Sequence, residues 1–195
     1  MNFSVLISVY YKEKPEYLKD AINSIFNQTL RPNEVILVED GKLTDELYNT
    51  IKKLQEKYNE IKTVCLKENQ GLGPALNEGL KYCSYDIVAR MDSDDICMPD
   101  RFKIQIDFME KHPDIDIISG WIDEFYGYKE NIISTRKTPE THDEIVKFGK
   151  SRNPINHPAA MFKKNVVCNI GGYKAIPLLE DYDLWVRAIL NGAHL

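Results

Sequence analysis

The stretch Ile87-Val88-Ala89-Arg90-Met91-Asp92-Ser93-Asp94-Asp95-Ile96 decides the expected fold. Its first five residues are largely apolar and bounded by charge, which is typical of a strand buried within a sheet. Three carboxylates, those of Asp92, Asp94 and Asp95, crowd its carboxyl end. Like charges this close repel one another unless a positive charge lies among them. We therefore expect a hard divalent cation, Mg²⁺ or Mn²⁺, which accepts oxygen ligands and keeps positions open for substrate phosphates.

Two other interpretations compete for this acidic turn. An EF-hand calcium loop counted from Asp92 needs Gly at its sixth position and Glu at its twelfth, where this chain has Cys97 and Lys103. A solvated turn that caps the following helix is the simpler alternative, because Pro99 suits a first helical turn and Asp is a common cap. The turn alone favours that structural role, and only its surroundings favour a ligand site.

Composition and charge limit the class of protein. The chain has 195 residues, of which 43% are hydrophobic, enough for one substantial core and one domain. A net charge of -5 with scattered basic residues argues against a nucleic-acid binder. The longest apolar runs are strand-sized, so we expect no transmembrane segment. The absence of a signal-peptide pattern, together with four cysteines that resemble reduced core residues, favours a cytoplasmic protein.

Strand and helix patterns alternate along the first half of the chain. Apolar runs predict strands at residues 3–9, 35–38, 61–66 and 87–91, separated by segments with helical spacing of apolar residues. Four such units predict an α/β fold with a doubly wound, mostly parallel sheet and helices on both faces. Ligands of such sheets lie beyond the carboxyl ends of the strands, where the chain order reverses.

The expected ligand edge carries Val9 and Tyr10, then Glu39 and Asp40, and then the acidic turn. The turn after the first strand lacks the glycine pattern that seats a dinucleotide, and no P-loop is present. Phosphates at this edge would need a metal, so the pattern favours a nucleotide diphosphate held through a cation.

The second half is less regular. Residues 115–121 read as a strand, and Tyr126, Tyr128 and Arg136 belong to an expected antiparallel excursion. A short helix at 140–148 and a returning strand at 158–162 follow. His157 either contacts the ligand, at its diphosphate or beyond it, or is purely structural, and the two interpretations are equally supported.

An ordered set of motifs resembles glycosyltransferase family 2, whose members are inverting, nucleotide-sugar-dependent enzymes with the GT-A fold. The matching residues are Val5 to Tyr10, Glu39-Asp40-Gly41, Asn69-Gln70-Gly71, Asn77-Glu78-Gly79, the acidic turn with Pro99, Arg101 and Gln105, Gly171-Gly172-Tyr173, Glu180-Asp181 and Leu184-Trp185-Arg187. The resemblance runs nearly end to end and is typical of bacterial polysaccharide enzymes. Leu76 departs from it, because many relatives carry Arg there.

The resemblance implies how the donor nucleotide is bound. Asp40 would accept a hydrogen bond from uracil, with Val9 and Tyr10 as the wall beside the base. A buried core aromatic is the alternative for Tyr10. Glu39 either contributes to the same site or caps the turn. The motifs of Asn69 and Asn77 are similar to the family's nucleotide-binding signatures.

The acidic turn receives its roles in the same way. Asp92 would meet the ribose or the metal, with Ser93 beside it on the nucleotide. Asp94 would be the main ligand bridging the cation to the diphosphate, and Asp95 either binds or orients. Arg90 offsets the charge of the turn or contacts the nucleotide, and a structural salt bridge is equally supported.

Asp181 is the expected catalytic base. With Glu180 it begins a helix whose Leu184 and Trp185 form a buried face, so the pair lies at the positive end of the helix dipole. A helix cap is the structural alternative. An inverting transfer needs one carboxylate to remove the acceptor proton, and in the resembling family that base is the Asp of this motif.

The expected protein is a single GT-A domain over residues 1–195, with a nucleotide-binding half (1–98) and an acceptor-side half (99–195) truncated at its C-terminus. It would transfer a sugar, with Mn²⁺ or Mg²⁺, from a UDP-sugar to a saccharide or lipid-linked saccharide in cell-surface polysaccharide synthesis. A location at the inner face of the membrane, by peripheral association, fits that role. The alternatives are a non-catalytic nucleotide-sugar-binding domain and a sugar-phosphate nucleotidyltransferase, whose glycine-rich loop is missing.

Overall fold

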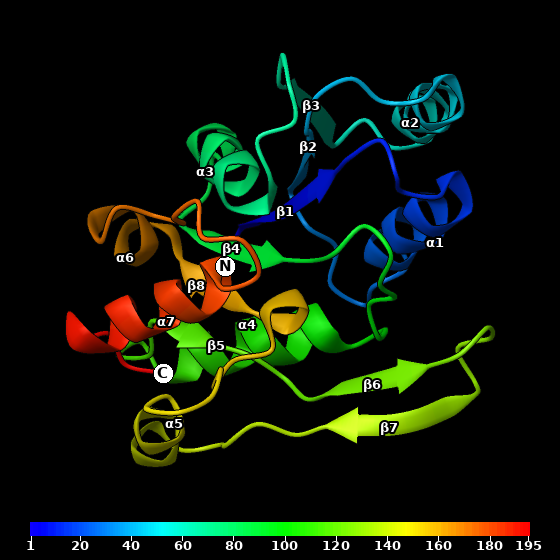
Figure 1. Ribbon diagram of the computed structural model, residues 1–195. Coiled ribbons are helices and arrows are strands. Elements are labelled where there is room, and N and C mark those ends of the chain that lie inside the picture. The colour runs from blue at the N-terminus through cyan, green and yellow to red at the C-terminus, as the bar shows by residue number, and fades with distance from the viewer.

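The structure, a computed structural model of residues 1–195, is an α/β fold built on a six-stranded sheet. The strands run in the order β3-β2-β1-β4-β8-β5 (Figure 1). Their bounds are β1 Phe3–Val9, β2 Glu34–Glu39, β3 Ile61–Cys65, β4 Ile87–Arg90, β5 Ile117–Ile118 and β8 Met161–Lys163. Strands β1 to β4 pair in parallel, whereas β8 is antiparallel to both β4 and β5. The predicted mostly parallel, doubly wound sheet is confirmed.

Helices cover both faces of the sheet because the side chains of a strand alternate between two apolar cores. Phe3, Val5 and Ile7 of β1 face one core, where α1 (Pro15–Phe26), α2 (Asp45–Lys57) and α4 (Arg101–Lys111) pack. Leu6 faces the other core, with α3 (Leu72–Tyr82) and α7 (Glu180–Leu190). In Figure 1, α3 lies across the sheet from α1 and α2.

The predicted antiparallel excursion is a separate hairpin of β6 (Ile122–Phe125) and β7 (Ile132–Arg136). Tyr126 and Tyr128 lie in its connecting loop and are exposed. The hairpin stands away from the main sheet (Figure 1). The remaining elements are α5 (His142–Phe148), the 3₁₀ turn η1 (His157–Ala159) and α6 (Lys164–Asn169).

The strand predicted at residues 115–121 is wrong in its length, since only Ile117 and Ile118 form β5. The backbone N–H groups of Asp116 and Ile117 both donate to the carbonyl of His194, at 2.8 and 3.3 Å. On the other side, the Ser119 hydroxyl donates to the carbonyl of Asn156 at 2.9 Å. Turn contacts therefore replace ladder pairing at both ends of the segment.

The four cysteines are free thiols. Cys83 and Cys97 are buried as expected, whereas Cys65 and Cys168 are exposed. None of the helices combines the length and the apolar run that crossing a bilayer requires.

Candidate active site

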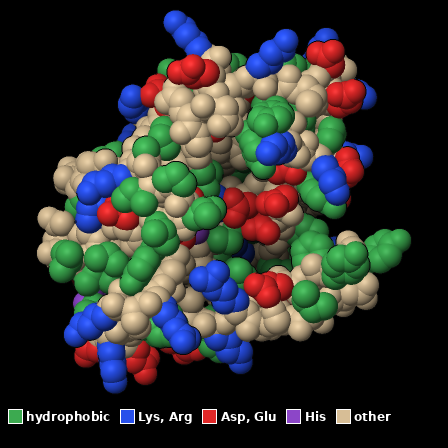
Figure 2. All heavy atoms as spheres, viewed as in Figure 1, with side chains coloured by type: hydrophobic (Ala, Val, Ile, Leu, Met, Phe, Trp, Pro, Cys, Tyr) green, Lys and Arg blue, Asp and Glu red, His purple; other side chains and the backbone are tan.

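The order of the strands places a ligand crevice between β1 and β4. From β1 the chain continues to β2 and β3 on one side, and it then returns to add β4 on the other. The carboxyl ends of β1 and β4 thus flank the reversal point, where open α/β sheets bind ligands. Val9 ends β1, and the acidic turn follows β4. Figure 2 shows acidic side chains gathered in a hollow in the region beyond the end of β4.

The acidic turn carries more negative charge than its surroundings compensate. Asp94 opens to solvent, but partial loss of hydration, followed by the charges of Asp92 and Glu13, raises its pKa. Asp95 is half-buried, and burial, followed by the charges of Asp92 and Asp94, raises its pKa to about 6. A positive charge in the hollow would lower both pKa values.

Two arginines, the buried Arg90 and the half-buried Arg101, contact the turn or the strand that leads into it. Arg90 is 1% exposed and forms an ion pair with Asp92, which is the structural salt bridge considered for it. Its Nε and Nη1 have no hydrogen-bond partner. Arg101 donates from Nη2 to the carbonyls of Arg90 at 2.8 Å and Ala160 at 3.2 Å. The two cations hold the end of β4 in place while offsetting only part of the acidic charge.

The chemistry of the turn fits a divalent cation that is shared with a substrate. No group of three or more His, Cys, Asp or Glu side chains is arranged to hold an ion by itself. Magnesium-type sites commonly use one or two carboxylates, with waters and substrate phosphates as the other ligands. Asp94 is exposed, and the carboxylates of Asp92 and Glu13 add negative charge around it, so the turn can supply the carboxylate ligand of such a site. Ser93, buried beside Asp94, donates its hydroxyl to the Glu13 carboxylate and orients the turn.

Asp40 anchors the turn that precedes α3. Its side chain is 3% exposed, and its Oδ1 and Oδ2 accept the backbone N–H groups of Gln70 at 2.7 Å and Gly71 at 3.0 Å. Asn69 donates from Nδ2 to the Asp40 carbonyl at 3.2 Å. Each carboxylate oxygen keeps a second lone pair, which is the capacity that hydrogen bonding to a base requires.

The other residues expected at the nucleotide differ in exposure. Val9 is buried, whereas the Tyr10 side chain is 43% exposed, so Tyr10 is not a buried core aromatic. Glu39 is buried and accepts a hydrogen bond from the Cys65 thiol at 3.1 Å. Of these three residues, Tyr10 offers the most accessible surface to a ligand.

Asp181 lies in the first turn of α7, which begins at Glu180 as predicted. Its Oδ2 accepts a hydrogen bond from Asn153 Nδ2 at 2.6 Å, and its Oδ1 accepts the backbone N–H of Tyr182 at 2.7 Å. These two donors orient the carboxylate. Because the group is only partly buried, it remains within reach of solvent.

Tyr173 is a buried tyrosine that pairs with His157. The Tyr173 hydroxyl is 3.0 Å from His157 Nε2, and both side chains are buried. Burial raises the pKa of Tyr173; the charge of Arg90 lowers it, and those of Asp181 and Asp92 raise it. The charges of the acidic turn and of Asp181 thus act in the same direction on the pKa of this hydroxyl. Burial, with the charge of Arg90, holds the His157 pKa well below its usual range, so its imidazole is neutral.

Asn77 lies on α3 and uses both atoms of its amide on the backbone of Tyr173. The side chains that the sequence did not single out are Glu13 and Asn153, whereas Tyr173 was named only as part of the Gly171-Gly172-Tyr173 motif. Glu13 stands in the turn after β1, so its place at the ligand edge was a usable signal. Asn153 lies 28 residues from the carboxylate that it orients, and no local pattern connects the two.

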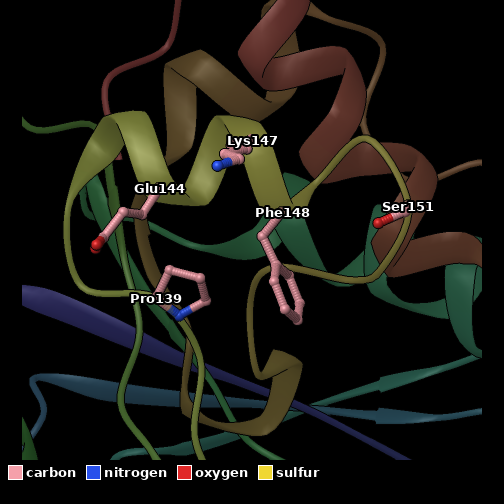
Figure 3. Close-up of a pocket in the computed structure, with 5 residues that line it drawn as sticks. All are labelled: Pro139, Glu144, Lys147, Phe148 and Ser151. Atoms are coloured by element: carbon pink, nitrogen blue, oxygen red, sulfur yellow. The ribbon is translucent and has the colours of Figure 1, made fainter.

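A separate pocket lies beside α5. Pro139, Glu144, Lys147, Phe148 and Ser151 line it (Figure 3). None of the predicted site residues contributes to it, and it brings together one acid, one base and one aromatic ring at the surface. The hollow at the acidic turn remains the better candidate for chemistry.

A doubly wound sheet with an acidic turn at its reversal point, completed by an antiparallel strand and a hairpin, is the GT-A fold of glycosyltransferases. The chain belongs to glycosyl transferase family 2, whose sequence pattern matches residues 4–170. A galactosyltransferase of Escherichia coli, described as "UDP-Gal:alpha-D-GlcNAc-diphosphoundecaprenol beta-1,3-galactosyltransferase", is 43% identical over 193 residues. The match covers 99% of this chain and 70% of that relative.

Solved structures agree with this fold. The mannosyltransferase PcManGT of Pyrobaculum calidifontis, in complex with GDP-Man and Mn²⁺, matches with a TM-score of 0.74 at 17% identity, covering 99% of this chain and 53% of that one. S. aureus TarS 1-349 in complex with UDP-GlcNAc matches with a TM-score of 0.73 at 23% identity, covering 98% and 54%. The chain thus spans about half the length of the solved chains that it matches.

Proposed function

We propose that this glycosyltransferase transfers a sugar, with inversion, from a UDP-sugar to a hydroxyl of a saccharide carried on a lipid diphosphate. The observation that carries the proposal is the partly uncompensated acidic turn at the reversal point of the sheet. The E. coli relative, whose description specifies both a UDP-sugar and a lipid-diphosphate acceptor, supports this choice of substrates.

On the donor side, Asp40 reads the uracil edge and Tyr10 covers the base, while Val9 forms the floor beneath it. Glu39, Asn69 and Asn77 support this site from behind, because their polar atoms contact protein groups. Asp92 meets the ribose and is held for that purpose by Arg90. Ser93 keeps the turn in position through Glu13.

Asp94 and Asp95 would hold Mn²⁺ or Mg²⁺ together with the diphosphate oxygens, with Asp92 at the edge of this set. When bound, the cation supplies Lewis-acid stabilisation of the charge that develops on the leaving diphosphate. The Mn²⁺ complex of PcManGT supports a cation in this fold. The protein's own contribution is the negative, partly dehydrated turn that favours a cation.

On the acceptor side, Asp181 acts as the general base. Its carboxylate takes the proton of the acceptor hydroxyl while that oxygen attacks the anomeric carbon, and the bond from this carbon to the diphosphate breaks on the opposite face. UDP leaves with the bonding electron pair. Because attack and departure take place on opposite faces, the anomeric centre is inverted. Asn153 keeps the carboxylate oriented for this step.

The lipid-linked acceptor implies work at the inner face of a membrane, in the synthesis of a cell-surface polysaccharide. The hairpin of β6 and β7 borders the hollow in Figure 2 and would line the acceptor side. A domain that binds a nucleotide sugar without turnover is the remaining alternative.

The test uses a panel of UDP-sugars with Mn²⁺ and GlcNAc-diphosphate carried on a short lipid. We expect UDP release to depend on the acceptor, and an α-linked donor to yield a β-linked product by NMR. Binding of UDP-sugar without transfer to any saccharide acceptor would support the binding module. An α-linked product would contradict inversion.

A further inference from the structure

The side chain of Asn77 hydrogen-bonds to a segment that is distant in the sequence. Its Oδ1 accepts the backbone N–H of Tyr173 at 2.7 Å, and its Nδ2 donates to the carbonyl of the same residue. A side-chain amide that pairs with both polar groups of one backbone unit fixes the position of that unit in two directions. Tyr173 is thereby tied to α3, whose own axis is fixed against the sheet.

The contact between Asn77 and this segment leaves no space for a side chain at Gly172. Gly172 has φ +63, and a Cβ built on it would lie 2.2 Å from the Asn77 Oδ1 atom. Arg187 of α7 donates to the carbonyls of Ile170 and Gly172, both at 2.7 Å. The backbone from residue 170 to residue 173 is therefore held by side chains of both α3 and α7.

A second contact joins the two helices nearer to the candidate base. A Cβ on Gly73, in the first turn of α3, would lie 2.6 Å from the Lys174 carbonyl and 3.3 Å from Glu180 Cβ. Gly71, the N-cap of α3, donates its N–H to Asp40. One rigid helix thus connects the Asp40 turn to the residue immediately before Asp181.

We propose that α3 sets the spacing between the donor site and the catalytic base, and that Asn77 is the positioning residue that clamps the base-bearing segment, residues 170–181, to it. This inference rests on the proposed function, because it takes Asp181 as the base. Asn77 would then act by fixing the backbone of Tyr173 and not by contacting the nucleotide. Loss of the amide would let Asp181 shift against the donor while the uridine site stays intact.

The experiment compares Asn77→Ala with Glu78→Ala. Glu78 is the next residue of α3 and pairs only with Lys81 at the surface, so its removal controls for a change on the same helix. Hydrogen exchange followed by mass spectrometry should show faster exchange of residues 170–182 in Asn77→Ala alone. Exchange of residues 39–41, at the donor site, should remain as in the wild-type protein.

Kinetics on the UDP-sugar reaction give the functional readout. A displacement of about 1 Å costs on the order of 100-fold in rate, so kcat of Asn77→Ala should fall by roughly 10- to 100-fold. The Kd for UDP should stay within about twofold of the wild-type value. Gly73→Ala, which tests the second contact without removing a hydrogen bond, should show the same split between kcat and Kd.

Several results separate the possible failures. Weaker UDP binding by Asn77→Ala with kcat preserved at saturating donor would overturn the proposal and make Asn77 a nucleotide ligand. Unchanged exchange at residues 170–182 would also overturn it. A wild-type protein that binds UDP but transfers no sugar would instead overturn the proposed function, and the exchange result would still decide whether the clamp exists.

Discussion

Replacing Asp95 by Asn should stabilise the metal-free protein at neutral pH. Burial, followed by the charges of Asp92 and Asp94, raises the pKa of Asp95 to about 6 in the fold. In an unfolded chain the pKa of Asp is about 3.9. The native state therefore binds the proton more tightly, and stability falls as the pH rises from the unfolded pKa through the folded one.

The size of the effect follows from the difference of about two pKa units. Each unit corresponds to about 1.4 kcal/mol, so the charged Asp95 costs the fold at most about 3 kcal/mol above its native pKa. Solvent near the half-buried carboxylate screens part of this cost. Well below the unfolded pKa the carboxyl is protonated in both states, so most of the gain from Asp95→Asn should already be lost at about pH 4.

The assay is urea unfolding in the presence of a chelator, at about pH 4 and about pH 7.5. Asp107→Asn is the control, because the hydrogen bond from Lys103 lowers the pKa of this exposed carboxylate and the expected sign is reversed. A gain from Asp95→Asn of equal size at both pH values, or a loss at neutral pH, would refute the electrostatic account of the turn.

Two further predictions concern the donor site. Asp94→Ala should abolish the increase in UDP affinity that Mn²⁺ or Mg²⁺ gives, because this exposed carboxylate is the proposed link between cation and diphosphate. Calorimetry with and without chelator measures the UDP affinity, and equal affinity of the wild-type protein in both conditions would contradict a metal-dependent donor site. Asp40→Ala should weaken uridine binding whether or not metal is present, and unchanged affinity would leave Asp40 only its contacts to Gln70 and Gly71.

The sheet and its ligand edge could be predicted because their signals are local. An apolar run such as residues 3–9 is itself the buried strand β1, and Thr44 caps α2 with its own hydroxyl, which accepts the N–H of Leu47 at 3.2 Å. Four such units in series allow few topologies. The acidic turn then falls at the reversal point by connectivity alone.

The contacts that hold the site could not be predicted, since they join distant segments. Asn77 and Tyr173 are 96 residues apart. The sequence near Asn77 is similar to a nucleotide-binding signature, and nothing in that pattern indicates the hydrogen bonds that Asn77 makes to the backbone of Tyr173. Glu13 and Ser93 meet across 80 residues. The short β5 is also explained by a distant contact. The backbone N–H groups of Asp116 and Ile117 donate to the carbonyl of His194 and not to a neighbouring strand.

The role of Asp181 is tested most directly by Asp181→Asn, assayed with UDP-sugar and the lipid-linked acceptor. The amide keeps the shape of the side chain but cannot accept a proton, and general-base assistance is typically worth ~10²–10⁴-fold in rate. We expect transfer to fall by about that factor while the Kd for the donor is unchanged. Loss of donor binding with turnover of the bound donor intact would contradict the assignment, and the base would have to be Glu180 or a residue of the segment 123–158.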